Sequence, residues 1–244
     1  MTALILAAGI AKRLRPLTDS TPKCLLPLGE KTILQRTVDN LRDSGVSRFV
    51  VVTGFLREMI EAHFAAHWPK LDVTFLHNPV YDSTNNIYSL WLAREAVAGR
   101  NLLLLDSDIV FDRRIVDALL TSPHADCIAL NRDIAVGEEE IKVRLGDDDR
   151  VQEISKVVAI PEAAGESIGI ERFSAAWVDH LYRVLDTMIR EEKRVDIFYE
   201  AAFERVIDEG SPLFAVDISA WPCMELDTVE DYRAAQQNIL RSLD

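Results

Sequence analysis

The chain begins with a short apolar run, residues 3–7, that leads into a loop suited to binding a polyphosphate. Small residues follow the run, then Lys12 and Arg13, and Lys23 stands a little further on. At the end of a strand such a loop lets backbone N–H groups approach a phosphate while the cations balance its charge. The loop fits neither the GxxxxGK[ST] pattern of a P-loop nor the GxGxxG fingerprint of dinucleotide-binding folds. The residues indicate a nucleoside triphosphate site of another type.

A second candidate group follows the apolar run at residues 102–105. Asp106 and Asp108 stand directly after this run, which is typical of a buried parallel strand. Ligands of open α/β sheets bind beyond the carboxyl ends of the strands, so a carboxylate placed there can hold Mg²⁺ against a triphosphate. An aspartate at such a place can equally cap a helix or a turn, and the sequence leaves both roles open.

A third group, Asn85 and Asn86, opens a predicted helix, with Ser89 close behind. Side-chain amides present both donors and acceptors, so a pair of them can read the edge of a pyrimidine. Either asparagine can instead cap the helix.

The elements that position these groups alternate along the chain. We expect strands at 3–7, 48–53, 72–76, 102–106 and 125–130, and helices at 32–44, 57–66 and 86–97. This alternation predicts βαβ units and a mainly parallel sheet. The following short runs at 142–145, 151–154 and 167–171 favour antiparallel strands, and helices at 174–191 and 196–209, a strand at 213–218 and a helix from Thr228 complete the expectation.

Charge and composition exclude several classes of protein. With 40 acidic and 27 basic residues the net charge is −13, so the surface repels nucleic acid and anionic membranes, and neither is expected as a partner. Cys24, Cys127 and Cys223 form no CxxC pair, which argues against a disulfide framework or a zinc site. The apolar run at the start lacks a basic segment before it and is far too short for a membrane span. We therefore expect a cytoplasmic protein that keeps its thiols reduced.

Many positions in the first 27 residues match one pattern in order, LAAGxGxRLxPLT followed by PKxxLP. The matching residues are Leu6, Ala7, Ala8, Gly9, Arg13, Leu14, Pro16, Leu17, Thr18, Pro22, Lys23, Leu26 and Pro27. In this the sequence resembles the nucleotidyltransferases that couple a nucleoside triphosphate to a phosphorylated small molecule. Ala11 departs from the pattern, since the family has glycine there; if that position needs a positive φ, alanine costs about 1 kcal/mol of strain.

The resemblance implies a three-layer α/β/α, Rossmann-like (GT-A-like) fold in one domain. About residues 1–130 would form the nucleotide-binding half and about residues 131–227 the acceptor-binding half, with a small antiparallel insertion. It also implies Asp108 and Asp227 as the Mg²⁺ pair, although Asp227 stands just before a predicted helix and could cap it.

The resemblance further assigns roles in catalysis and nucleotide binding. Arg13 would grip the triphosphate, Lys23 would bridge the α-phosphate and the acceptor, and Lys156 would contact the acceptor's phosphoryl group, unless Lys156 is an ordinary surface lysine. The nucleotide-binding set is Leu6, Ala8, Gly9, Ala11, Lys12, Arg13, Lys23, Asn85, Asn86, Ser89 and Asp106.

The run from Tyr81 to Leu90 resembles the NNIYSL segment of the cytidylyltransferase branch, whose members activate phosphocholine and phosphonates with CTP. Matches continue to Tyr232 and so cover essentially the whole chain. CTP is therefore the expected donor. A phosphate or phosphonate oxygen is already a nucleophile, so the expected chemistry is a direct attack on the α-phosphorus that releases pyrophosphate without a general base.

The acceptor is less defined by the sequence. A quaternary ammonium binds aromatic faces, yet Ile141 stands about where phosphocholine members carry tryptophan. Two phosphonate classes remain open, one with an ammonium that pairs with acids such as Glu200 and one with a carboxylate that pairs with cations such as Arg172. Phe198 and Tyr199 are adjacent and cannot both face one pocket. The candidate acceptor-binding set is Lys142, Arg144, Lys156, Glu171, Asp196 and Tyr199.

The resulting prediction is a cytidylyltransferase that acts on a phosphonate or phosphocholine-like acceptor and uses CTP and Mg²⁺. The sequence leaves a homodimer open. The first rival of this prediction is a sugar-1-phosphate nucleotidyltransferase using UTP, dTTP or GTP, against which Asn85, Asn86 and Ser89 argue. A nucleotide-binding regulator with a decayed site is the alternative from another class.

Overall fold

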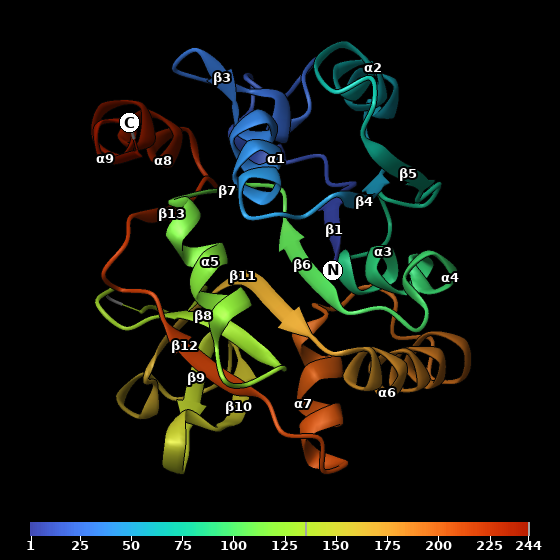
Figure 1. Cartoon of the computed structure of the whole chain (residues 1–244), viewed down its shortest axis with the longest axis vertical. Helices are drawn as coiled ribbons and strands as arrows, with labels where there is room; N and C mark the ends of the chain where they lie inside the picture. Colours follow the sequence, from blue (N-terminus) through green and yellow to red (C-terminus); the bar gives the residue numbers. More distant parts are fainter. Residues whose placement is uncertain (135, 244) are drawn as a thin grey trace.

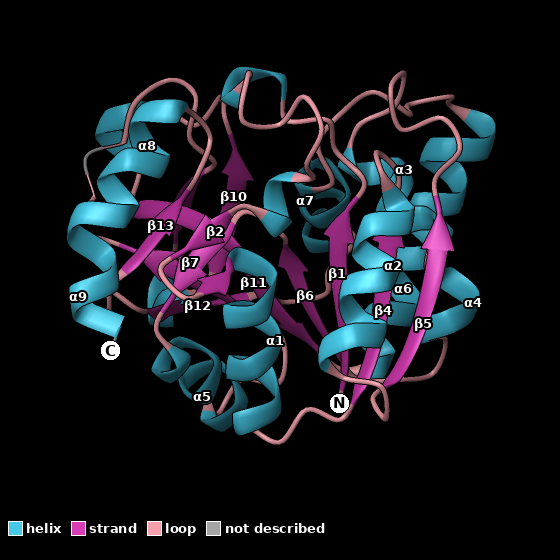
Figure 2. Ribbon diagram, turned by 90° about the horizontal axis from the view of Figure 1, so that it is seen from above, coloured by secondary structure: helices cyan, strands magenta, loops and turns pink. Residues whose placement is uncertain are grey.

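The computed structural model describes residues 1–134 and 136–243. Its first half is built on four parallel strands that lie side by side and end at one edge of the sheet (Figure 2). In spatial order these are β6 (Leu102–Asp106), β1 (Thr2–Ala7), β4 (Arg48–Thr53) and β5 (Asp72–His77).

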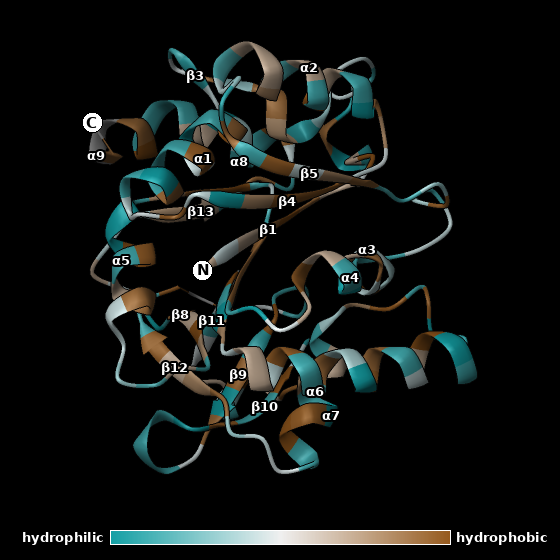
Figure 3. Ribbon diagram, turned by 45° about the vertical axis from the view of Figure 1, so that its right-hand side comes forward, coloured by the Kyte–Doolittle hydropathy of each residue, from teal (hydrophilic) through white to brown (hydrophobic). Residues whose placement is uncertain are grey.

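Helices cover both faces of these strands. Figure 3 shows β1 and β4 lying between α1 and α2 on one side and α3, α4 and α6 on the other. The bounds of these helices are α1 (Ile33–Asp43), α2 (Arg57–His67), α3 (Asn86–Leu92), α4 (Arg94–Val97) and α6 (Ala175–Asp186). The layers follow from crossovers between parallel strands, each of which carries a helix back over the sheet.

Alternation of side chains along β1 builds the two halves of the core. Leu4 and Leu6 belong to the cluster beneath α3 and α6, whereas Ala3 and Ile5 belong to the cluster beneath α1 and α2. Strand residues point to opposite faces in turn, so a strand with helices on both sides must be apolar throughout. Burying each large aliphatic side chain contributes about 1.5–3 kcal/mol.

The second half of the chain adds antiparallel strands to the same sheet. β11 (Gly165–Phe173) pairs antiparallel with β6, β8 and β9, and so joins the parallel half to the rest. The other added strands are β8 (Cys127–Asn131), β9 (Lys142–Leu145), β10 (Val151–Ser155) and β12 (Phe214–Asp217). Both predicted halves thus contribute to one sheet (Figure 1).

Small strand pairs and further helices complete the fold. Two short pairs, β2 (Pro27–Leu28) with β3 (Lys31–Thr32) and β7 (Ile109–Phe111) with β13 (Cys223–Glu225), are antiparallel. The remaining helices are α5 (Arg113–Thr121), α7 (Glu200–Asp208), α8 (Val229–Ala234) and α9 (Leu240–Leu243). Short π-helical segments, Thr187–Glu191 and Ala235–Ile239, extend α6 and α8.

The predicted α/β fold, with a mainly parallel central sheet and added antiparallel strands, is confirmed. The strand predictions at 48–53, 102–106 and 142–145 match the observed bounds. The prediction for α7 was wrong at its start, because residues 196–199 lie before the helix, which begins at Glu200. The short strands β7 and β13 and the helix α5 were not predicted. No helix in the described part of the chain is long and apolar enough to cross a membrane.

Candidate active site

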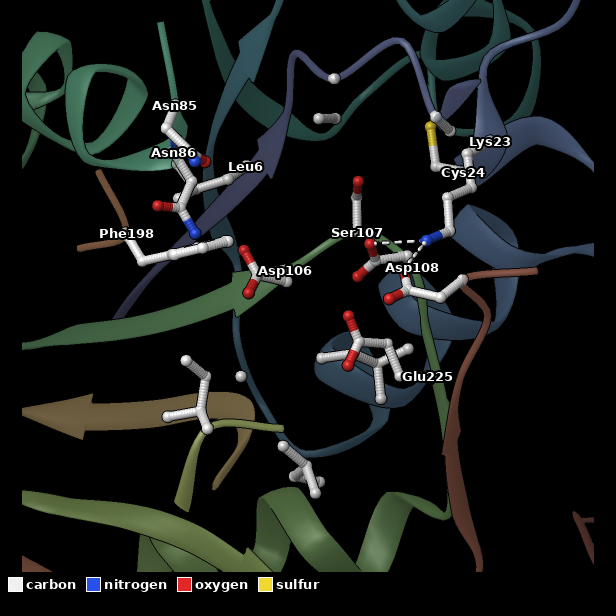
Figure 4. Close-up of a pocket in the computed structure, with 18 of the residues that line it drawn as sticks. Leu6, Lys23, Cys24, Asn85, Asn86, Asp106, Ser107, Asp108, Phe198 and Glu225 are labelled. Carbon is white, nitrogen blue, oxygen red and sulfur yellow. Dashed lines mark hydrogen bonds and ion pairs between the residues drawn. The ribbon is translucent and has the colours of Figure 1, made fainter. Parts of the chain in front are cut away.

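A pocket of about 580 Å³ opens where the parallel strands β1 and β6 end. Figure 4 shows Lys23, Asp108 and Glu225 at one side of it, Asn85, Asn86 and Phe198 at the other, and Asp106 between them. The structure thus brings together the predicted nucleotide-binding and metal-binding residues, all of which line the pocket: Leu6, Ala8, Gly9, Ala11, Lys12, Arg13, Lys23, Asn85, Asn86, Ser89, Asp106, Asp108 and Asp227.

The loop after β1 makes a left-handed turn at Ala11, so the condition that the sequence analysis set for strain at this residue is met. Ala11 has φ +52° and ψ +54°, and its carbonyl accepts hydrogen bonds from the hydroxyl of Thr18 at 2.9 Å and the backbone N–H of Leu14 at 3.1 Å. A non-glycine residue in this region carries about 1–2 kcal/mol of strain. Leu14 is fully buried in a cluster with Leu226 and Tyr232, which ties this loop to the C-terminal segment. That packing positions both Arg13 and Asp227, the sequence neighbours of two of its members.

A close backbone approach supports the same loop from β4. A Cβ on Gly54 would lie 2.6 Å from the carbonyl oxygen of Ala8 and 2.7 Å from the Cβ of Tyr81. The neighbouring N–H of Phe55 donates to that carbonyl at 3.1 Å. Only glycine permits this contact, which holds the wall of the pocket in place.

Three carboxylates gather at one side of the pocket. Asp108 follows β6, Glu225 ends β13 and Asp227 lies just beyond it, and each offers an oxygen within 4.8 Å of the others. Oδ1 of Asp108 is buried and has no hydrogen-bond partner among the described residues. A set of carboxylate oxygens with an unpartnered member suits a hard divalent cation such as Mg²⁺. The residues present therefore fit the metal that the resemblance implied.

Lys23 and Arg13 are bound to this carboxylate trio. Nζ of Lys23 lies 2.9 Å from Oδ2 of Asp108 and 2.9 Å from Oδ1 of Asp227, and Arg13 pairs with the other oxygen of Asp227 at 2.5 Å. Burial by itself would lower the pKa of Lys23, but the two aspartates outweigh it and raise that pKa. Burial would likewise raise the pKa of Asp227, and the charges of Lys23 and Arg13 lower it instead.

The two amides cap a helix and also line the pocket. Oδ1 of Asn85 accepts from the N–H of Asn86 at 2.7 Å and caps α3, while Oδ1 of Asn86 accepts from the N–H of Tyr199 at 3.0 Å. Both side chains still line the pocket. Ser89 is held by Asn78, whose Nδ2 donates to its hydroxyl at 3.1 Å.

A buried acid cluster, consisting of Asp106, Glu171 and Glu200 around Tyr199, adjoins the pocket; Glu200 and the half-buried Asp106 also line it. The hydroxyl of Tyr199 is 3.0 Å from Oδ2 of Asp106 and 3.5 Å from Oε1 of Glu171. Burial, then the neighbouring carboxylates, raise the pKa values of Asp106 and Glu171 well above their usual range. Burial also raises the pKa of Glu200 to about 7. Oε2 of Glu171 and Oε2 of Glu200 have no hydrogen-bond partner among the described residues.

Several predicted acceptor residues lie off the pocket wall, which corrects the sequence-based expectation. Lys142 is 1% exposed, and its Nζ donates to the backbone carbonyls of Gly137, Glu138 and Glu140. Arg144 is bound to the side chains of Gln152 and Glu153 on the neighbouring strand.

Asp196, Glu171 and Tyr199 also lie outside the lining of this pocket. Tyr199 is fully buried in the core, so its neighbour Phe198 is the aromatic residue that faces the pocket. The expectation that these two adjacent residues cannot both face one pocket agrees with this arrangement. Glu171 does not line the pocket, but it belongs to the buried acid cluster that adjoins it.

Lys156, the predicted contact of the acceptor's phosphoryl group, lines the pocket. Its Nζ lies 3.2 Å from Oε2 of Glu139 and 4.6 Å from the centre of the Phe198 ring. The positive charge of Lys156 also acts on Glu200, whose pKa it lowers against the larger effect of burial.

Glu225 and Asn78 are among the polar pocket residues that the sequence analysis did not select. Glu225 stands two residues before Asp227, and the alternation of a strand would have placed both on one side, but β13 was not predicted. Asn78 directly follows β5, so the rule that selected Asp106 at a strand end could have found it too.

Comparison with known proteins identifies the family of this chain. Residues 3–205 match the model of the MobA-like NTP transferase domain. The chain belongs to this family of NTP transferases. Among similar solved structures, the CTP:phosphocholine cytidylyltransferase of Streptococcus pneumoniae has a TM-score of 0.80 and 24% sequence identity, with 98% of each chain covered. That likeness confirms the nucleotidyltransferase fold.

Characterised relatives of this NTP transferase are mostly cytidylyltransferases. The choline-phosphate cytidylyltransferase of Streptococcus pneumoniae is 27% identical over 239 residues, 97% of either chain. The 2-aminoethylphosphonate cytidylyltransferase of Lancefieldella rimae is 26% identical over 233 residues, which is 95% of this chain and 90% of that protein. The predicted enzyme class, a nucleotidyltransferase resembling the cytidylyltransferase branch, is confirmed.

Proposed function

We propose that this enzyme transfers CMP from CTP to a phosphonate that carries a primary ammonium group, and that it releases pyrophosphate. The observation that carries the proposal is the buried acid cluster beside the pocket. Glu200 lines the pocket, is 6% exposed, and has one oxygen without a partner among the described residues. A buried carboxylate without a counter-ion is costly, so a cation from the substrate would stabilise it.

The chemistry of that partner favours N–H groups. A primary ammonium has three N–H donors that can satisfy the open oxygens of Glu200 and its neighbours, whereas a quaternary ammonium has none. A quaternary ammonium instead needs several aromatic faces around it. Of the described lining residues only Tyr81 and Phe198 are aromatic, and Ile141 supplies an aliphatic surface.

A carboxylated phosphonate is less well supported than the aminoalkyl class. The cations considered for it were Lys142, Arg144 and Arg172, and the first two are engaged away from the pocket. Arg172 donates to the backbone carbonyls of Leu119 and Ser122. This leaves Lys156 as the cation near the buried acids, and we assign it to the acceptor's phosphoryl group.

The choice of CTP rests on the amide pair and on the relatives. Because Oδ1 of Asn86 already accepts from Tyr199, its Nδ2 group is left to donate to an acceptor atom on the base. The relatives include cytidylyltransferases for choline phosphate, 2-aminoethylphosphonate and phosphoglutamine. A sugar-1-phosphate nucleotidyltransferase using UTP, dTTP or GTP is the second candidate, since a UTP–glucose-1-phosphate uridylyltransferase of Haloferax volcanii is 25% identical.

The residues of the pocket account for the reaction without a general base. A phosphonate oxygen forms a bond to the α-phosphorus while the bond from that phosphorus to the departing pyrophosphate breaks, and pyrophosphate keeps the electron pair. Arg13 and Lys23 would bind the triphosphate oxygens, and Lys156 would orient the phosphonate in line with them. Asp108 and Asp227, with Glu225 as a third ligand, would hold Mg²⁺, which neutralises charge on the phosphates.

The test is a comparison of matched acceptors. Pyrophosphate release is measured with Mg²⁺ and each of CTP, UTP, dTTP and GTP, with 2-aminoethylphosphonate and with its N,N,N-trimethyl analogue. These two acceptors carry the same charge and differ at the ammonium, where three methyl groups replace the three N–H groups. We expect turnover with CTP and a kcat/KM at least about tenfold higher for the primary amine, which corresponds to one lost charged hydrogen bond. Glu200→Gln should reduce that preference, whereas Glu191→Gln, on an exposed part of the chain, should not.

Other outcomes would contradict the proposal in specific ways. Equal rates with both acceptors, or a preference for phosphocholine, would refute the role of the buried acids. Turnover of a sugar 1-phosphate with another nucleotide would establish the second candidate. Tight CTP binding without turnover on any acceptor would favour a nucleotide-binding regulator.

A further inference from the structure

The ammonium of Lys23 lies between two carboxylates of the metal-binding trio. It makes ion pairs of 2.9 Å with both Asp108 and Asp227, and the Lys23 side chain is only 10% exposed. These partners are 85 and 204 residues away in the sequence, so the folded structure, not local geometry, places the ammonium there. Arg13 holds the remaining oxygen of Asp227.

We propose that Lys23 acts as an internal cation that closes the metal site until nucleotide and metal enter together. In the ligand-free protein its ammonium takes the place of the divalent ion, and in the loaded enzyme the same side chain turns to the triphosphate. This inference rests on the proposed metal-binding role of Asp108 and Asp227.

The two occupants exclude each other for reasons of distance and charge. A Mg²⁺ ion must approach carboxylate oxygens to about 2.0–2.1 Å. An ammonium hydrogen-bonded to both aspartates lies in the space between them, and two cations at such a separation repel strongly in a partly buried site. Lys23 must therefore leave both carboxylates before an ion can bind them.

The side chain of Lys23 can make this move without a change in the backbone. Lys23 is the first residue of the short 3-10 helix η2 (Lys23–Leu25). The other two residues of η2, Cys24 and Leu25, are buried in the core beneath α1. The flexible four-carbon stem of lysine allows the ammonium to swing while its Cα stays in place. Lys23 already lines the pocket together with Arg13 and Lys12, so the ammonium would remain beside a bound triphosphate.

The exchange makes metal and nucleotide binding interdependent. When a divalent ion arrives alone, Lys23 loses two charged hydrogen bonds in a poorly solvated place and gains nothing. When the ion arrives with a triphosphate, phosphate oxygens replace the two aspartates as partners of Lys23. This change of partners for Lys23 produces a coupling free energy between metal and nucleotide binding. Because such a coupling is reciprocal, each ligand strengthens the binding of the other.

The experiment measures metal affinity and needs no turnover. Mn²⁺ is titrated into the full chain, with and without a non-hydrolysable CTP analogue, and free Mn²⁺ is followed by electron paramagnetic resonance. Removing one positive charge from the site with Lys23→Met should tighten Mn²⁺ binding without nucleotide by about tenfold or more. The same substitution should reduce the gain in Mn²⁺ affinity that the nucleotide produces.

Two further variants control this comparison. Lys12→Met removes a cation that lines the same pocket but makes no ion pair with Asp108 or Asp227 in the part of the chain that is described, so nucleotide-free Mn²⁺ affinity should stay within about twofold of wild type. Lys23→Gln, which can still donate one hydrogen bond, should tighten Mn²⁺ binding as Lys23→Met does, and it replaces that variant if the apolar side chain prevents folding.

The outcomes separate this inference from the proposed function. Mn²⁺ binding that is unchanged or weaker in both Lys23 variants would overturn the internal-cation role, as would a Lys12 variant that tightens binding equally. Absence of Mn²⁺ binding in every variant, even with nucleotide, would also overturn the internal-cation role, because it would show that Asp108 and Asp227 bind no metal. Failure of every phosphonate acceptor would refute the proposed function alone, because the titration contains no acceptor.

Discussion

Replacing Glu200 by glutamine should stabilise the ligand-free protein at alkaline pH. Burial raises the pKa of Glu200 from 4.5 to about 7, so the folded state holds its proton more tightly than the unfolded chain does. As pH rises from 4.5 towards 7, the unfolded chain gives up this proton first, and the folded state loses stability. Above pH 7 the full cost of ionising a buried carboxyl is present.

The size of this cost follows from the change in pKa. Each pKa unit is worth about 1.4 kcal/mol, so a change from 4.5 to about 7 amounts to about 3 kcal/mol at pH 8. Glu200 is 6% exposed, so solvent screening reduces this little. Glutamine has nearly the same shape and no charge. The variant should therefore be about 3 kcal/mol more stable than wild type at pH 8 and nearly equal to it at pH 4.

Urea unfolding at a series of pH values measures this difference directly. The free energy of unfolding is compared for wild type, Glu200→Gln and the exposed control Glu191→Gln, without metal or nucleotide. A stability gain that does not grow between pH 4 and pH 8, or a variant that is less stable than wild type at pH 8, would refute the reasoning. If the stability gain of Glu191→Gln also increased between pH 4 and pH 8, the gain would come from the change in net charge and not from the burial of Glu200.

Three further predictions concern the loop, the metal site and a corrected acceptor residue. Asp227→Asn should lower kcat by at least about a hundredfold, because it removes a carboxylate from the trio, and circular dichroism should show an intact fold; a rate near wild type would refute its metal-binding role. Ala11→Gly should relieve about 1–2 kcal/mol of left-handed strain but add about 1 kcal/mol of unfolded-state entropy, so thermal unfolding should show a change between none and about 1 kcal/mol of stabilisation. A destabilised variant would contradict the strain at Ala11. Lys142→Met should cost about 1–3 kcal/mol in urea unfolding, since it strands backbone carbonyls that now accept from Nζ, and it should leave the acceptor KM unchanged; a raised KM with unaltered stability would restore Lys142 to the acceptor site.

The strands of the parallel half could be predicted from the sequence because their signal is local. The runs Arg48–Thr53 and Leu102–Asp106 are apolar and are bounded by polar or turn residues. A strand that is buried on both faces must be apolar along nearly its whole length. Where an element depends on a distant partner, the signal fails, as for β13, a three-residue strand that exists because it pairs with β7.

Many residues that line the pocket could also be selected from the sequence: the strand-end rule selected Asp106 and Asp108, the loop pattern selected Arg13 and Lys23, and the family resemblance implied Asp227. Asp108 and Asp227 are far apart in the chain, yet both follow strands that end at the pocket. What the sequence could not show is that Lys23 is bound between them. That contact depends on the packing of Leu14 and Leu226 in a common cluster, which no local pattern records.

The acceptor side was decided by the tertiary structure alone. Lys142 and Arg144 have the types and spacing of anion-binding residues, but the loop at 137–140 folds its carbonyls over Lys142, and β10 offers Glu153 to Arg144. Residue types and spacing determined the class of enzyme and the edge of the sheet where the pocket lies, since these depend on strand ends and short loops. Which charged side chains reach the acceptor depends on partners from other elements, because a charge buried on folding is directed by whichever hydrogen-bonding group the fold places beside it.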